Sequence, residues 1–269
     1  HLSIRRQRQM CIRDSISISW ALKGALLALL GRNEEALDTY SKSIELDPKD
    51  KSAWIGKART LMTLGKHEES LETISRAIEL DPNGAFAWNC KSQILSNLGR
   101  NEEALDTYSK SIELDPKDKS AWIGKARTLM TLGKHEESLE TISRAIELDP
   151  NNSSLWNSKA TLLIELKRDK EASEAYSQAL SKAVQITESN PYDLDAWVDS
   201  GIALMGLRRF KDASEALSKA AGLTTHMQLS EFMEDCATAL LGSFHIGESL
   251  HEFQKKDYGN AIKELRSAM

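Results

Sequence analysis

Short segments with apolar residues at helical spacing run along the whole chain, and polar turn residues separate them at regular intervals. Six tryptophans, from Trp20 to Trp197, stand 34, 34, 34, 34 and 41 residues apart. The five prolines, from Pro48 to Pro191, follow the same period. The pattern therefore predicts a structural unit that is repeated along the chain.

Each unit is predicted to be a pair of antiparallel helices. In the first unit, the helix that contains Trp20 is expected to end at Gly31, because glycine readily adopts the left-handed conformation that terminates a helix. A second helix is expected to begin near Glu34 and Glu35, whose negative charges suit a helix N-terminus, and to end before Pro48. One such hairpin cannot bury its apolar face alone, so neighbouring hairpins must stack.

The repeated unit resembles the tetratricopeptide repeat in its length and in the residues at its characteristic positions. These are, in the first unit, Trp20, Gly24, Leu27, Ala36, Tyr40, Ser43 and Pro48, and in the fourth, Trp122, Ala126, Leu129, Ser138, Ile142, Ala145 and Pro150. The resemblance is to prokaryotic and especially archaeal members. It implies an all-α fold, an α-solenoid in which stacked antiparallel helical hairpins form a right-handed superhelix, and a role as a non-enzymatic protein–protein interaction scaffold.

Three regions are expected along the chain. Residues 1–15 resemble translated adapter sequence and are predicted to be a non-native or disordered leader. Residues 16–227 contain six repeats, at 17–50, 51–84, 85–118, 119–152, 153–193 and 194–227. The fifth has seven extra residues, two helical turns, which can lengthen its second helix and keep the buried face in phase. Residues 228–269 are expected to form an extra helix and a degenerate, truncated seventh hairpin.

A second repetition is superimposed on the first. Residues 30–83 and 98–151 are identical over 54 positions, at an offset of 68 residues, or two units. Two explanations remain open: a recent duplication of a two-repeat block, or an error in sequence assembly. A true duplication would preserve the stacking of the hairpins, because it is in phase with the repeat.

Composition and motifs argue against several functions. The net charge of −5 gives no basic face for nucleic acid, and no apolar run is long enough to cross a membrane. The three cysteines are far apart, and no phosphate-binding or hydrolase motif occurs, so we expect no cofactor, no metal site and no catalytic site. The one metal candidate, His245, Glu248 and His251, is interpreted as a surface cluster. A cytoplasmic location is expected.

The first helices of stacked hairpins are expected to line a concave groove. At about 100° per residue, the residues opposite the second helices mix apolar side chains with Arg, Asn and Gln, which suits a peptide or protein ligand. The predicted groove residues are Ile55, Arg59, Met62, Phe86, Asn89, Gln93, Ile123, Arg127, Met130, Asn157 and Thr161. The alternative for some of them is packing against neighbouring first helices.

Related family members hold a chaperone's terminal carboxylate with Lys and Asn at particular groove positions. The fifth position of each unit, where those members carry Lys, is never Lys in this sequence. The residues there are Ala21, Ile55, Asn89, Ile123, Asn157 and Val198, so we do not expect a chaperone carboxylate-clamp ligand. A column of lysines (Lys23, Lys57, Lys91, Lys125, Lys159) is interpreted as flanking packed surface, not as a basic strip for acidic ligands. Two alternatives to a free-standing scaffold stay open: a regulatory arm of a larger enzyme, and self-association through the uncapped C-terminal end.

Overall fold

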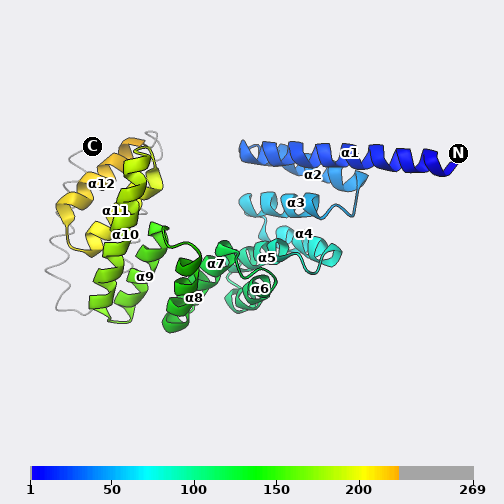
Figure 1. The fold of residues 1–269 in the computed structure, drawn as a ribbon. Helices are drawn as coiled ribbons and strands as arrows, with labels where there is room; N and C mark the ends of the chain where they lie inside the picture. The colour runs from blue at the N-terminus through cyan, green and yellow to red at the C-terminus, as the bar shows by residue number, and fades with distance from the viewer. Residues whose placement is uncertain (1, 224–269) are drawn as a thin grey trace. The chain divides into compact units, whose positions relative to one another are not determined.

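The computed structural model describes residues 2–223, with side chains from residue 16 onward, and all regular structure within this range is helical (Figure 1). The helices are α1 (Leu2–Leu29), α2 (Asn33–Leu46), α3 (Lys51–Thr63), α4 (His67–Leu80), α5 (Ala85–Asn97), α6 (Asn101–Leu114), α7 (Lys119–Thr131), α8 (His135–Leu148), α9 (Ser153–Glu165), α10 (Asp169–Ser189), α11 (Leu194–Gly206) and α12 (Phe210–Leu223). The predicted all-α fold is confirmed.

The chain forms two compact units, which divide between Gly133 and Lys134. In the first unit, α1 packs on α2, α3 on α4 and α5 on α6, and the first helices α1, α3, α5 and α7 also contact one another in sequence. In the second unit, α9 packs on α10 and α11 on α12, and α9 also contacts α11. The first unit is therefore three stacked hairpins followed by the single helix α7, and the second unit begins with α8, which packs on α9, and continues with two hairpins.

Two of the expected regions need comment. Residues 2–15, expected to be a non-native or disordered leader, are the helical start of α1, and their foreign origin stays a prediction. The extra helix and seventh hairpin expected at 228–269 lie outside the described residues. The lengthening of the fifth unit is confirmed, because α10 has 21 residues where the other second helices have 14, and its buried residues continue at helical spacing from Ala172 to Thr187.

The turn inside each hairpin has the same backbone conformation. Gly31, Gly65, Gly99 and Gly133 have φ values of 71–73°, where an L side chain would be strained. Lys167 and Arg208, which replace this glycine in the last two hairpins, adopt the same left-handed conformation at φ 58° and 60°. The turn geometry is thus retained at the expense of strain where glycine is absent.

The turn between hairpins is held by the repeated tryptophan. The indole nitrogen of Trp54 donates to the carbonyl oxygen of Pro48 at 3.0 Å, and Trp88 donates to Pro82 at 2.8 Å. The same bond recurs for Trp122, Trp156 and Trp197 with the preceding proline. The shared period of tryptophan and proline therefore reflects one hydrogen bond that joins each hairpin to its predecessor.

Candidate functional site

The candidate site is the surface of α3, α5 and α7 that is turned away from the second helices, which we call the first-helix face. It contains the predicted groove residues of the first unit. Arg59 and Arg127 are exposed, Phe86 is 52% exposed, and the neighbouring Ile55, Met62, Ile123 and Met130 are partly buried. Because α3, α5 and α7 contact one another in order, these side chains belong to one continuous layer of helices.

An arginine and an aromatic ring meet on this face. The guanidinium carbon of Arg59, on α3, lies 5.7 Å from the centre of the Phe86 ring on α5, within the range of a cation–π contact. Such stacking leaves the edge of the guanidinium free to donate hydrogen bonds. Arg59 is therefore held over an exposed apolar surface while its donors stay accessible.

The arginines of the first-helix face differ from most others among the described residues. Arg32, Arg76, Arg100, Arg144, Arg168 and Arg209 each pair with an acidic side chain three residues later on a second helix. Within the described part of the chain, neither Arg59 nor Arg127 has a carboxylate partner. Two guanidinium groups that suit a carboxylate are thus available on one face.

Asn89 and Gln93 are placed differently from the prediction that they pair with a ligand. Asn89 is only 1% exposed, and its amide nitrogen donates to Asp118 Oδ2 at 2.8 Å and to Ser120 Oγ at 2.5 Å. Gln93 donates to Asn89 Oδ1 at 3.2 Å. Since Asp118 caps the N-terminus of α7, Asn89 joins α5 to α7, which is the packing role that the sequence left open as an alternative. Gln93 supports Asn89 from within α5.

Asn157 and Thr161 belong to the second unit and have a similar packing role. Asn157 is 5% exposed, and its amide nitrogen donates to the carbonyl oxygen of Asp199 at 3.0 Å and to its Oδ1 at 3.3 Å. Thr161 donates to the carbonyl oxygen of Asn157 at 3.1 Å. The bonds of Asn157 join α9 to α11, whereas the bond of Thr161 lies within α9. The candidate site therefore rests on the first-unit residues alone.

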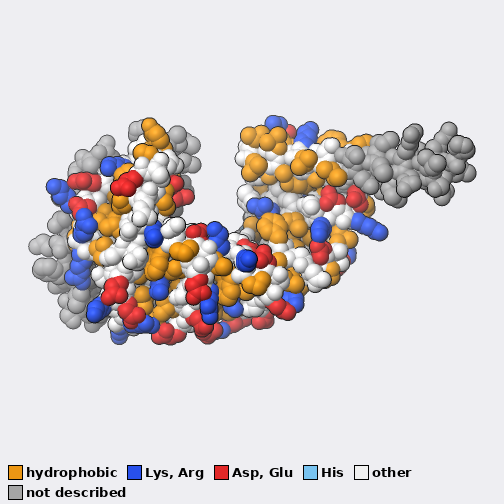
Figure 2. Space-filling view, viewed as in Figure 1, with side chains coloured by type: hydrophobic (Ala, Val, Ile, Leu, Met, Phe, Trp, Pro, Cys, Tyr) orange, Lys and Arg blue, Asp and Glu red, His pale blue; other side chains and the backbone are white. Residues whose placement is uncertain are grey.

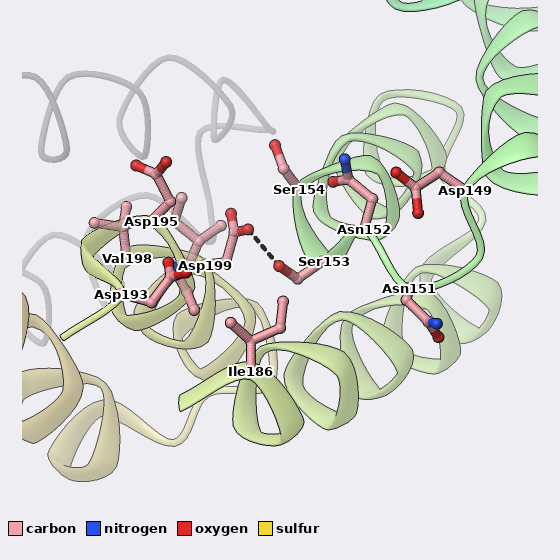
Figure 3. Close-up of a pocket in the computed structure, with 12 residues that line it drawn as sticks. Asp149, Asn151, Asn152, Ser153, Ser154, Ile186, Asp193, Asp195, Val198 and Asp199 are labelled. Carbon is pink, nitrogen blue, oxygen red and sulfur yellow. Dashed lines mark hydrogen bonds between the residues drawn. The ribbon is translucent and has the colours of Figure 1, made fainter. Parts of the chain in front are cut away.

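The second unit contains an acidic hollow of about 700 Å³ that sequence reasoning missed (Figure 3). Its wall includes Asp149, Asp193, Asp195 and Asp199, and Ser153 Oγ donates to Asp199 Oδ2 at 2.5 Å. Burial is the main cause that raises the pKa of Asp199 above its ordinary value, and the hydrogen bonds from Ser153 and Asn157 oppose this shift. A signal was present, because Asp199 is the one charged residue at a repeat position otherwise occupied by Leu, Gly, Cys or Ser.

The lysine column shows the expected apolar packing at three positions. The ammonium groups of Lys23, Lys91 and Lys159 lie 5.2–5.5 Å from the ring centres of the tryptophans three residues earlier. These lysines flank the packed tryptophans and keep their charges at the surface.

No described helix is both long and apolar enough to cross a membrane. No group of three or more His, Cys, Asp or Glu side chains with metal-binding geometry occurs in the described part of the chain. The candidate His245, Glu248 and His251 lies outside it.

Comparisons with known proteins agree with the repeat pattern. Residues 20–189 match the family model described as the cilia and flagella-associated protein 70 C-terminal domain. A comparison with curated protein sequences gives no significant match.

Solved structures share the fold at low sequence identity. Pseudomonas aeruginosa PilF aligns with a TM-score of 0.62 at 17% identity, over 83% of this chain and 99% of its own. TTC0263 of Thermus thermophilus, titled a thermophilic TPR protein, aligns with a TM-score of 0.57 at 21% identity, over 70% and 99%. MamA of Desulfovibrio magneticus RS-1 aligns with a TM-score of 0.57 at 17% identity, over 62% and 94%.

Tetratricopeptide folds serve in general as scaffolds for protein–protein interaction and are typically non-catalytic. The helical hairpins, their repeated tryptophan and proline, and the family match lead to one assignment. The chain belongs to the tetratricopeptide-repeat family whose model is described as the cilia and flagella-associated protein 70 C-terminal domain.

Proposed function

We propose that this protein is a non-enzymatic scaffold that binds a peptide or protein segment on the first-helix face, in the groove predicted from the sequence. The observation that carries the proposal is the pair of exposed arginines, Arg59 and Arg127, which lack acidic partners within the described residues and lie among apolar side chains. The six predicted repeats are proposed to be the scaffold itself.

The chemistry of this face favours a ligand with a carboxylate beside apolar side chains. Arg59 and Arg127 present planar donors that match a carboxylate, and hydrogen bonds to charged groups contribute about 1.5–3 kcal/mol each. Phe86, Ile55 and Met62 supply the apolar surface beside Arg59. A ligand of this class would lose affinity as ionic strength rises, because exposed charges are screened by salt.

The duplicated block offers two equivalent contact sets. Ile55, Arg59 and Met62 on α3 recur as Ile123, Arg127 and Met130 on α7, with α5 between them. A ligand with two similar motifs could engage both sets, and the second contact would then be intramolecular. Affinity would rise without any new kind of contact.

The test uses peptides selected from a displayed random library against the full chain. Fluorescence anisotropy then measures their affinity for Arg59→Ala/Arg127→Ala and for a matched control, Arg76→Ala/Arg144→Ala. The control residues are also copies 68 positions apart, but each is paired with a glutamate on a second helix.

We expect the Arg59→Ala/Arg127→Ala variant to lose roughly tenfold to a hundredfold in affinity, from the loss of charged hydrogen bonds. The control should change less than about twofold, because exposed ion pairs contribute little. Equal affinities of the two double variants would contradict the proposed site.

A further inference from the structure

The N-terminal hairpin carries an unusual surface, a row of exposed apolar side chains on α1. Ile18, Leu22, Leu26 and Leu29 are 55%, 67%, 58% and 86% exposed, and at about 100° per residue they fall within an arc of roughly 80°. We call them the α1 stripe. Hydrophobic side chains cover much of the coloured part of α1, from residue 16 onward, in Figure 2. An apolar surface of this kind marks an interaction site in a soluble protein.

Two positions of the stripe, those of Leu22 and Leu26, are covered in later hairpins, whereas the positions of Ile18 and Leu29 are exposed in α3, α5 and α7 as well. The residue that corresponds to Leu26 is Thr60 in α3, Ile94 in α5 and Thr128 in α7, and these are 3%, 0% and 4% exposed. In each case the helix contacts the second helix of the preceding hairpin. Leu22 and Leu26 therefore lie on a stacking face that lacks an occupant within the described residues, and Ile18 and Leu29 extend its apolar surface.

Another hairpin with tyrosine at the usual contact position would not fit this face. Leu22 corresponds to Gly56 and Gly124, which lie directly against the rings of Tyr40 and Tyr108 from the preceding second helix. Even a methyl group at Gly56 would lie 2.4 Å from a Tyr40 ring carbon. A leucine at this position therefore requires a partner with a smaller contact side chain.

The surface of α1 supplies such a partner for itself. Ala21, Ala25 and Ala28 each immediately precede a leucine of the stripe and form a row of small side chains beside it. Ala25 is exposed, whereas Ala21 and Ala28 are partly buried against the hairpin core around Tyr40 and form the floor of the row. A leucine ridge next to an alanine groove on one helix is self-complementary, because a two-fold axis places each ridge in the opposite groove.

Charge and area also favour a second copy. Lys23 is the one charged side chain among residues 16–30, and its ammonium group lies over the Trp20 ring. The stripe thus has neither a charge that would repel its copy nor a charge that would attract an acidic or basic partner. With on the order of 100 Å² for each fully exposed Leu or Ile side chain, the exposed fractions of the four stripe residues would let two copies bury roughly 500 Å², which suits only a weak dimer.

We propose that the α1 stripe is a homodimerisation surface, on which two copies of this chain pack α1 against α1 about a two-fold axis. The Leu22, Leu26 and Leu29 ridge of one copy lies against the alanine row of its partner. This surface lies at the N-terminal end of the stack and is separate from the first-helix face on α3, α5 and α7.

The proposal is tested by sedimentation equilibrium of the full chain. The protein concentration is varied between about 1 and 200 µM, which brackets the affinity expected of a small interface. The mass should rise from the 30.0 kDa of the monomer to twice that value and no further. Leu22→Glu/Leu26→Glu should weaken the dimer by roughly tenfold or more, because it would bury charge without a partner. The control Leu80→Glu/Leu148→Glu changes two exposed leucines on second helices and should leave the dimer unchanged.

A second variant distinguishes a specific dimer from non-specific hydrophobic association. Ala25→Trp adds apolar surface but fills the alanine row, so it should weaken the dimer, whereas non-specific association or binding to lipid would increase. Circular dichroism confirms that each variant stays folded. A monomeric wild-type chain, mass that keeps growing with concentration, or a dimer unaffected by Leu22→Glu/Leu26→Glu would each overturn the proposal.

Discussion

The contact between successive hairpins depends on a glycine that admits a tyrosine ring, and enlarging this glycine should destabilise the stack. Gly124 lies within α7, and a Cβ atom there would be 2.4 Å from the hydroxyl oxygen of Tyr108 and 2.5 Å from its ring. Tyr108 is 2% exposed and belongs to a cluster with Leu95, Ala104 and Ala121. Its ring therefore has little room to retreat by the ångström that an ordinary contact requires.

The expected cost of Gly124→Ala combines two opposing effects. Overpacking a well-packed core costs about 1–3 kcal/mol. Alanine within a helix recovers about 0.5–1 kcal/mol relative to glycine. The net loss in the free energy of unfolding should therefore be about 1–2 kcal/mol, which corresponds to a fall in Tm of several degrees for a chain of this size.

The chain itself contains a natural compensated pair. Cys90 corresponds to Gly124 on its first helix, and the side chain that it meets in one buried cluster is Ile74, where the first, third and fifth hairpins carry tyrosine. A larger residue on the first helix thus accompanies a smaller one on the preceding second helix. Gly124→Ala/Tyr108→Ile should accordingly be more stable than the sum of the single variants implies, by roughly 1 kcal/mol or more.

Urea denaturation followed by circular dichroism measures these differences as shifts in the transition midpoint. The slopes of the transitions must be equal for this comparison, because an array of repeats can unfold in parts and a changed slope would reveal it. The matched control is Gly99→Ala, at φ 73° with no atom within 4 Å of the added methyl. It should cost about 1–2 kcal/mol through backbone strain alone, and Tyr108→Ile should not rescue it. Additive costs for Gly124→Ala and Tyr108→Ile would refute the argument from the ring contact.

Three further predictions concern single side chains. Burial raises the pKa of the Cys90 thiol to about 11, so iodoacetamide at pH 8 should label it, by mass spectrometry, only after urea unfolding; rapid labelling of the folded chain would contradict its burial. Burial also raises the pKa of Asp199. The contribution of Asp199 to stability is therefore most favourable below the ordinary aspartate pKa and is lost as pH rises through the raised value. Asp199→Asn should raise Tm by a few degrees at pH 7 and leave it unchanged near pH 3, and an equal gain at both pH values would contradict the assignment. Lys167→Gly should stabilise the chain by about 1 kcal/mol in urea denaturation, because Lys167 has φ 58°; a loss of stability would show that its side chain matters more than the strain.

Most of the fold could be predicted from the sequence because the repeat depends on local chemistry. Glycine or its substitutes end each first helix, and a proline follows each second helix in the first five hairpins, so the spacing of Trp20, Gly31 and Pro48 indicates a hairpin without knowledge of its neighbours. The direction of a helix's buried face is likewise set locally, because it depends only on the number of residues per turn. Seven extra residues add two turns, and the 21-residue α10 could therefore be anticipated.

The candidate site was only partly predictable, because the same helical position can face a ligand or a neighbouring helix. Sequence periodicity grouped Arg59 with Asn89, but only the packed helices showed that Arg59 is exposed over Phe86 while Asn89 is buried against the cap of α7. The acidic hollow around Asp199 joins side chains more than 50 residues apart, from Asp149 to Ile202, which no local pattern connects.

The sequence by itself thus determined the hairpins, their order and the family, since turns and helix ends are set by neighbouring residues. Only the tertiary structure decided which polar groups hold the stack together and which stay available. That choice depends on contacts between hairpins. Asn89 has a helix cap within reach, and Gly56 is covered by the preceding second helix. Within the described residues, Arg127 has no carboxylate partner and Leu22 has no covering helix.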